Sequence, residues 1–162
     1  MYNIGDRIVH PMHGAGIVDD IITQTVNGKT LEYYILKLPS NNMTIMIPVA
    51  TSDKIGIRDV ISEERANELI SLAATLDTEQ SSNWNQRYRD NAAKIKSGNL
   101  DEVVRVIKSL TYRDIKNGLS TGERKMLHSA KHILLSELVL AKNADYKDIE
   151  QELEDAITSV SK

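Results

Sequence analysis

Cysteine is absent from this chain of 162 residues, which excludes disulfide bonds, zinc–thiolate sites, iron–sulfur clusters and cysteine nucleophiles. No apolar run approaches the ~20 residues that a helix needs to span a bilayer. The opening MYNIGDRIVH lacks the apolar core of a signal peptide, so we expect a cytoplasmic protein. Phenylalanine is also absent, and Trp84 is the single tryptophan. The 41% of hydrophobic residues is nevertheless enough for a packed core, which argues against wholesale disorder.

The formal net charge is only −3, but the charges are unevenly distributed along the chain. Residues 82–142 hold 12 basic and 6 acidic side chains, whereas residues 61–81 and residues 143–162 each carry a net charge of −4. A basic block between two acidic segments indicates a surface that binds a polyanion.

Residues 1–60 have the composition of short β-strands. Four runs rich in Ile, Val, Leu, Thr and Tyr are predicted as strands, at residues 7–10, 16–25, 30–38 and 43–49. Asn27 and Gly28 stand between the second and third runs, and both residues accept the positive φ of a type I′ hairpin turn. We therefore expect a small SH3/Tudor-like antiparallel β-barrel or a strongly bent sheet.

The pattern becomes helical after this segment, and the first residue of each predicted helix is one that caps helices well: Ser62, Asn83, Asn99, Ser120 and Asp145. Ser120 and Glu123 form an S-x-x-E capping box. The apolar stripe that follows them is broad, which suits the central helix of a bundle. The last helix is acidic and is expected to end near Val160. The sequence thus predicts an α+β fold of two domains, residues 1–60 and residues 61–162, the second with about five helices.

Few residues suggest catalysis. His128 and His132 are four apart and share a helix face, as metal-binding pairs do, but neither a third ligand nor the glutamate of a zinc-protease motif accompanies them. His10 and His13 flank Pro11 in a loop, where a functional role and turn packing fit equally well. There is no nucleophile elbow and no phosphate loop. We therefore expect no enzymatic activity, no metal and no cofactor.

Trp84 allows two interpretations. At helical spacing it joins Tyr88, Ala92 and Ile95 in one stripe, as a core tryptophan would. It also lies in the first turn of its helix among cationic residues, where an exposed indole can stack on bases or wedge between base pairs. The basic faces of the helices are similarly open to two interpretations, as solvated surface or as phosphate contacts.

Several separate motifs occur in the order found in the CarD/CdnL family of bacterial transcription regulators, which the chain resembles along nearly its whole length. The opening motif is IGDRIVHPMHGAG at residues 4–16, followed by LEYYIL at 31–36, TIMIP at 44–48 and IGIR at 55–58. In the second half, NWNQRYR at residues 83–89 and GLSTGERKML at 118–127 match equally well.

The resemblance implies a Tudor-like domain that binds the β subunit of RNA polymerase and a helical domain that contacts promoter DNA without sequence specificity. In this family the tryptophan, here Trp84, wedges into the minor groove at the upstream edge of the melted region and stabilises the open complex. The DNA-contacting positions that the resemblance implies are Trp84, Gln86, Arg87, Arg89, Arg124 and Lys125. The implied polymerase-binding positions are Gln24, Thr44, Ile45, Met46, Ile47 and Pro48. No membrane or small-molecule substrate is implied.

This chain departs from some relatives, which carry arginine where it has Gln24, Met46 and Gln86. The polymerase contact is therefore expected to be more apolar here, and one phosphate contact to be a neutral hydrogen bond. An alternative function belongs to another class: a protein-interaction module in which a Tudor-like domain binds a peptide or a sheet edge and the helices serve as a scaffold.

Overall fold

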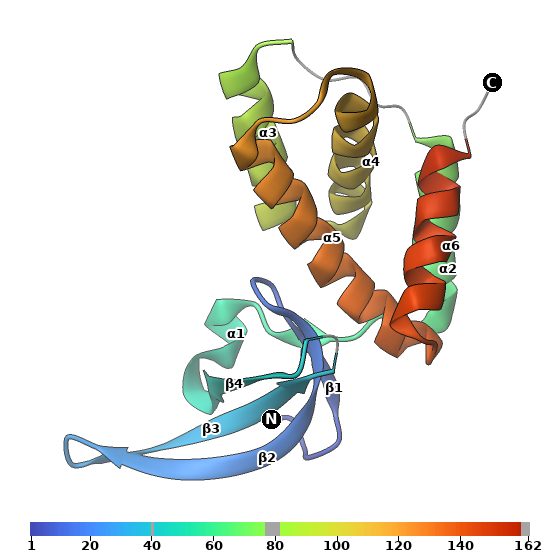
Figure 1. Cartoon of the computed structure of the whole chain (residues 1–162). Helices are drawn as coiled ribbons and strands as arrows, with labels where there is room; N and C mark the ends of the chain where they lie inside the picture. Colours follow the sequence, from blue (N-terminus) through green and yellow to red (C-terminus); the bar gives the residue numbers. More distant parts are fainter. Residues whose placement is uncertain (40, 77–81, 160–162) are drawn as a thin grey trace.

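The computed structural model describes residues 1–39, 41–76 and 82–159, and places a five-stranded sheet at one end of a bundle of helices (Figure 1). The strands are β1 (Arg7–His10), β2 (Gly14–Val26), β3 (Lys29–Leu38), β4 (Met43–Pro48) and β5 (Arg58–Asp59). A short 3-10 turn (Val49–Thr51) and the helix α1 (Ser52–Ile55) precede β5. The remaining helices are α2 (Glu63–Thr75), α3 (Trp84–Lys96), α4 (Leu100–Asn117), α5 (Thr121–Lys142) and α6 (Tyr146–Thr158). The predicted α+β fold is therefore confirmed.

The sheet is antiparallel, with the strand order β4-β3-β2-β1-β5. Asn27 and Gly28 form the predicted hairpin turn between β2 and β3, with φ angles of 52° and 78°. A bulge between Val18 and Asp20 interrupts the β2–β3 register, and a bulge of this kind bends a strand and increases its twist. One face of the bent sheet encloses a small core, formed by Ile8, Val18, Tyr34, Leu36, Leu38, Ile47 and Ile57.

Helices α2 to α6 each begin directly after a predicted capping residue. The side chains of Ser62, Asn83, Asn99 and Ser120 each accept a hydrogen bond from a backbone N–H in the first turn of α2, α3, α4 and α5, whereas Asp145 caps α6 without a side-chain bond. The expected end of α6 near Val160 lies outside the described residues. None of the helices in the described part of the chain is both long and apolar enough to cross a membrane.

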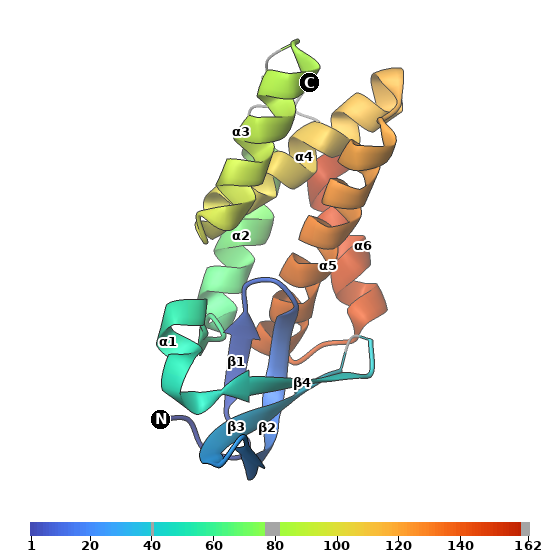
Figure 2. The ribbon, with the colours of Figure 1, turned by 90° about the vertical axis from the view of Figure 1, so that its left-hand side faces the viewer.

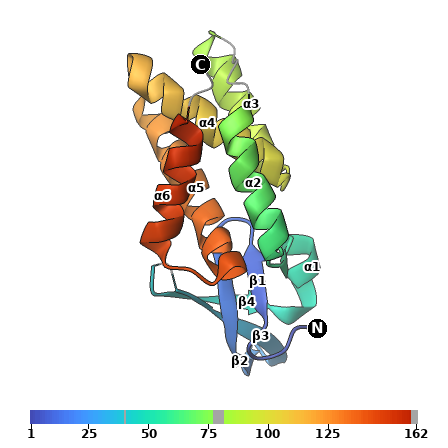
Figure 3. The ribbon, with the colours of Figure 1, turned by 90° about the vertical axis from the view of Figure 1, so that its right-hand side faces the viewer.

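Helix α5 is the centre of the molecule, as its broad apolar stripe predicted. It contacts α2, α3, α4 and α6, and its C-terminal half also lies against β2 (Figure 2). Helices α2 and α6 lie side by side on the far side of the bundle from α3 (Figure 3). The bundle core is formed by apolar side chains of α2, α4, α5 and α6, among them Leu69, Ile107, Leu134 and Leu153. Because α5 belongs to the bundle and also reaches the sheet, it connects the two halves of the chain.

Candidate nucleic-acid and protein interfaces

Trp84 is the first residue of α3 and is 42% exposed. Helix α3 begins at the end of the bundle farthest from the sheet (Figure 1). Its indole Nε1 donates a hydrogen bond to Ser120 Oγ over 3.0 Å. Its ring stacks on Tyr88, with 5.0 Å between ring centroids and 19° between the ring planes. The structure thus decides against a core tryptophan: the indole is exposed and is also held in one orientation by two contacts.

The first turn of α5 approaches the stacked rings closely. A Cβ atom added to Gly122 would lie 3.4 Å from Tyr88 Cε2 and 3.9 Å from Trp84 Cζ2, which is ordinary van der Waals contact. The hydroxyl of Ser120, besides accepting from Trp84, accepts from the backbone N–H of Glu123 and donates to the Glu123 carboxylate. The capping residue of α5 therefore also orients the indole.

Arg87 does not face solvent. The side chains of Arg87 and Glu123 are each 2% exposed, and they form a double hydrogen bond of 2.7 Å (Nε to Oε2) and 3.3 Å (Nη2 to Oε1). Burial alone raises the pKa of Glu123, but the hydrogen bonds and positive charge of Arg87 outweigh this, so the pKa lies below its ordinary value. The expectation that Arg87 contacts DNA phosphate is therefore corrected: its charge is paired with Glu123 inside the helical half.

The other predicted DNA-contacting side chains are exposed. Arg89 and Lys125 point away from the core, and Arg124 is 64% exposed, with Asp114 4.0 Å away. Gln86 donates a hydrogen bond to Asp90 on the next turn of α3. The structure therefore places one apolar ring and three cationic side chains on α3 and the first turn of α5. That combination is suited to stacking on bases with simultaneous contacts to phosphates.

The acidic helix α6 pairs with part of the basic block. Lys131 Nζ lies 2.9 Å from Glu154 Oε2, and Lys142 Nζ lies 2.6 Å from Glu152 Oε1. These two lysines lie at the middle and at the C-terminal end of α5, away from its first turn, which contacts Trp84. Glu152 and Glu154 of α6 thus neutralise two of the cations of α5.

The predicted protein-binding residues lie at one edge of the sheet, because β4 pairs only with β3 among the described strands. Thr44 and Met46 are exposed and Pro48 is half-buried on one face of β4, whereas Ile45 and Ile47 alternate toward the core. Ile47 is 1% exposed, so its side chain is not available to a partner as the resemblance had implied. What β4 offers a partner is its edge backbone and one side-chain face.

Gln24 shares that face although it lies in another strand. The register pairs Gln24 with Leu31, and Leu31 is two residues from Tyr33, which pairs with Pro48. Alternation along the strands therefore places Gln24, Leu31 and Met46 on one side of the sheet. Leu31 and Met46 are each 41% exposed, so this face is partly apolar, as the departures from the relatives led us to expect.

The four histidines gather where the sheet meets α5. The rings of His10 and His13 are 4.6 Å apart, and a hollow of 330 Å³ between the β1–β2 turn and α5 is lined by His13, His128 and His132. His132 Nε2 lies 3.3 Å from Asn41 Nδ2. Burial, followed by the charge of His13, lowers the pKa of His10. Within residues 1–39, 41–76 and 82–159, no three histidine or carboxylate side chains are placed to hold a metal ion.

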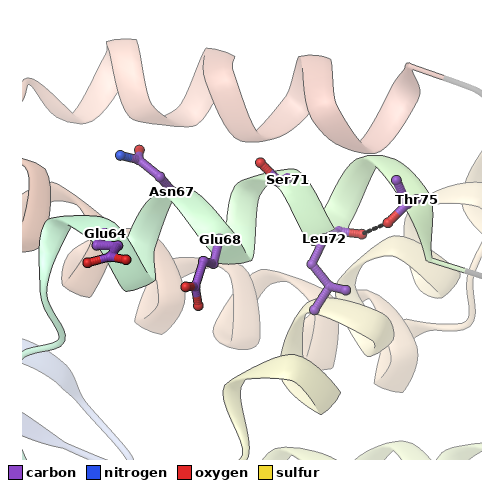
Figure 4. A pocket seen from close by; sticks show the side chains of 6 residues that line it. All are labelled: Glu64, Asn67, Glu68, Ser71, Leu72 and Thr75. Atoms are coloured by element: carbon purple, nitrogen blue, oxygen red, sulfur yellow. Dashed lines mark hydrogen bonds between the residues drawn. The ribbon is translucent and has the colours of Figure 1, made fainter.

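A second hollow runs along the outer face of α2 and is shown in Figure 4. Two carboxylates, Glu64 and Glu68, line it together with Asn67 and Ser71, and Thr75 donates its hydroxyl hydrogen to the Leu72 carbonyl. Its negative charge makes it unsuitable for a nucleic acid. It therefore adds nothing to the surfaces at Trp84 and β4.

Sequence comparison identifies the family to which both halves of the chain belong. The model of the CarD C-terminal domain matches residues 68–154, and that of the CarD-like/TRCF RID domain matches residues 2–61. The chain belongs to the CarD family. A relative in Bacillus subtilis (strain 168), named "Putative transcription factor YdeB", is 34% identical over 149 residues, which are 92% of this chain and 97% of the relative. CarD domains thus account for both halves of the molecule, and the relative is similar along nearly the whole of it.

Sequence reasoning missed part of the site. Tyr88 was assigned to an apolar stripe, Ser120 to a helix cap and Glu123 to a capping box, yet all three contact Trp84 or Arg87. The signals were present as local motifs. Their convergence depends on helix packing between residues 36 positions apart in the chain.

Proposed function

We propose that this CarD-family protein regulates transcription by binding, without catalysis: it attaches to the β subunit of RNA polymerase and stabilises the open promoter complex. The observation that carries the proposal is Trp84. A 42% exposed indole, fixed by a hydrogen bond and a stacked ring, is a costly surface feature unless it has a partner. Its preset orientation reduces the entropy that must be lost when it stacks on a base.

The polymerase contact is assigned to β4 and to the face that it shares with Gln24. An edge strand presents unpaired backbone N–H and C=O groups, and a partner strand can add to it. The exposed Met46 and Leu31 provide apolar contacts beside that edge. Because backbone pairing supplies much of the affinity in this mode of binding, neutral residues at positions 24 and 46 are compatible with it.

The DNA contact is assigned to Trp84, Arg89, Arg124 and Lys125. Stacking contributes ~1–3 kcal/mol per base, which is comparable with the few kcal/mol needed to unstack a base step. The indole alone therefore does not open a closed duplex. It binds a junction that polymerase has already distorted better than closed DNA, and this difference in affinity shifts the equilibrium toward the open complex.

Attachment to polymerase supplies the effective concentration that weak DNA binding requires. The net charge of −3 and the acidic α6 helix oppose independent binding to the genome. Contacts made to phosphates and to a base face carry no sequence information, so the proposed DNA contact is independent of sequence.

Capture by immobilised polymerase β subunit tests the attachment. Met46→Glu adds a charge to the proposed binding face and should reduce capture at least tenfold, whereas Met12→Glu alters an exposed methionine in the β1–β2 turn and should have no effect. Equal capture of both variants and of the unaltered chain would contradict the assignment of β4. Absence of capture even for the unaltered chain at low salt would refute polymerase binding itself.

A further inference from the structure

The C-terminal half of α5 is attached to the sheet by an ion pair between a buried glutamate and a half-buried arginine. Glu137 is 1% exposed, and its two carboxylate oxygens accept from Arg58 Nη1 at 2.6 Å and from Arg58 Nη2 at 2.7 Å. The Glu137 carboxylate also accepts from the backbone N–H of Ile61, 3.0 Å away. Arg58 belongs to β5 and Ile61 to the segment between β5 and α2. One side chain of α5 thus fixes the edge of the sheet and the connection between the two halves.

Other contacts of the same helix turn support this ion pair. Ser136 Oγ accepts from the backbone N–H of Ala15 at 2.9 Å, and the Leu140 carbonyl accepts from Arg7 Nη1 at 2.6 Å. Val9, Ala15 and Leu140 form a small apolar cluster of their own. These α5 residues lie between positions 136 and 140, little more than one helical turn. One turn earlier, His132 Nε2 also lies 3.3 Å from Asn41 Nδ2.

Beside this attachment the two halves are separated by a cleft of 340 Å³. Pro11, Ile55 and Gly56 of the first half and Ile95 and Leu100 of the second half line it, together with Arg58 and Glu137. Because the cleft separates the sheet from the α3–α4 turn, few contacts there resist a change of angle between the halves. The angle therefore depends on the contacts between α5 and the sheet, which include the ion pair of Arg58 and Glu137.

The same helix also holds the indole. Its capping residue Ser120 accepts from Trp84, and Glu137 lies 17 positions further along, about 26 Å at 1.5 Å per residue. A continuous helix is stiff over that length, so the orientation of Trp84 is transmitted to Arg58 and the sheet. The polymerase-binding strand β4 is at the opposite edge of the sheet from β5.

We propose that Arg58 and Glu137 are positioning residues that set the angle between the β4 edge and the Trp84 end of the bundle. The inference rests on the proposed function, because the angle matters only if both ends are engaged in one complex. A tether raises the concentration of the indole at the junction, and a fixed angle adds the correct orientation. Loss of the ion pair leaves β4 able to bind polymerase and Trp84 able to bind DNA. It weakens the coupling between these two binding events.

The main test uses Arg58→Gln, which removes the charge that pairs with Glu137. Arg65→Gln is the matched control, because Arg65 forms an ion pair of similar length with Asp101, 2.9 Å, inside the helical half. A second variant, Arg58→Lys, retains the charge but not the paired geometry, so its effect should be intermediate. It replaces Arg58→Gln in the comparison if Arg58→Gln is poorly folded. The full-length chain is used in each case.

Three measurements are compared: capture by the polymerase β subunit, binding of a fork-junction DNA by the free chain at low salt, and the lifetime of open complexes formed by bacterial RNA polymerase holoenzyme. Arg58→Gln should leave the first two within twofold of the unaltered chain and shorten the open-complex lifetime by about fivefold or more, within the usual range of coupling between sites. Arg65→Gln should change none of the three. A general loss of folding would reduce fork binding as well, and would contradict a positioning role.

Interdomain distance provides a readout that does not depend on polymerase. Because the chain has no cysteine, Glu32→Cys in β3 and Ala93→Cys in α3 can carry a pair of spin labels without other changes. Arg58→Gln should broaden the distance distribution and Arg65→Gln should not. An unchanged distribution, or an unchanged open-complex lifetime, would overturn the proposal. If the unaltered chain failed to bind polymerase, the proposed function would fail while the distances still decided whether Arg58 holds the angle.

Discussion

The buried pair of Arg87 and Glu123 leads to a prediction that separates a structural arginine from a DNA-binding one. Arg87→Met leaves the Glu123 carboxylate, 2% exposed, without its charged partner. Breaking a buried ion pair in this way costs about 3–5 kcal/mol, because the remaining charge stays desolvated. For a chain of this size the loss should lower the melting temperature by roughly 6–20 °C.

Replacing both partners should have a different result. The double variant Arg87→Met/Glu123→Leu removes the ion pair and its desolvation cost together, and such replacements are often neutral or stabilising. We expect the double variant to regain most of the lost stability in thermal and urea unfolding. The exposed Arg89→Met serves as the control and should change stability by less than about 0.5 kcal/mol.

Salt dependence then shows which arginine contacts phosphate. Fluorescence anisotropy of a fork-junction DNA, measured at several salt concentrations, should give a slope for Arg89→Met that is smaller by about 0.9, the value for one lost phosphate contact. The folded Arg87→Met/Glu123→Leu variant should keep the slope of the unaltered chain. A reduced slope for this double variant, or an unaltered melting temperature for Arg87→Met, would refute the assignment of Arg87 as a buried structural residue.

Three further predictions concern single contacts. Gly14 and Gly28 both have positive φ, but a Cβ added to Gly14 would lie 2.5 Å from Ser136 Oγ, whereas one added to Gly28 meets no atom within 4 Å. In urea unfolding, Gly14→Ala should therefore lose about 1–3 kcal/mol more stability than Gly28→Ala. Equal losses would show that the contact with α5 is unimportant. Ser120→Ala removes the hydrogen-bond acceptor of the Trp84 indole and should destabilise the folded protein by about 1 kcal/mol. It should also increase quenching of the tryptophan fluorescence by acrylamide, whereas Ser120→Thr, which keeps a hydroxyl, should not. Because the folded-state pKa of Glu123 is lowered, its stabilising contribution is present above the unfolded-state pKa of about 4.3 and is lost as the pH falls through the folded-state pKa. Glu123→Gln should therefore flatten the fall in melting temperature below about pH 4.5. An unchanged fall of the melting temperature at acid pH would contradict the pairing.

The features that were predicted from sequence are those decided by neighbouring residues. The Asn27-Gly28 hairpin depends on which residues tolerate positive φ, and the helix starts depend on one side chain and the first turn that it caps. The central place of α5 was also predictable, because a stripe of that breadth must be covered on several sides. Helix α1 and strand β5 were missed, since four and two residues are too short to show a period.

The site was predicted less completely, because sequence does not show which charge meets which. Arg87 and Arg89 are two positions apart in one helix, yet the first is buried against Glu123, 36 residues away, and the second is exposed. No local motif marks Glu137, and its partner Arg58 lies in a strand 79 residues earlier. Long-range pairs of this kind depend on the packing of the two halves, which no local pattern encodes.

The central claim is that the exposed indole of Trp84 stabilises the open complex without contributing to polymerase binding. The most direct measurement is the lifetime of open complexes on one promoter with the unaltered chain, Trp84→Ala and Trp84→Phe, after equal capture by the β subunit has been verified. We predict that Trp84→Ala retains its fold and its polymerase binding but loses the added lifetime, and that Trp84→Phe retains part of it, because a smaller ring still stacks. A full effect of the folded Trp84→Ala variant on open-complex lifetime would contradict the account.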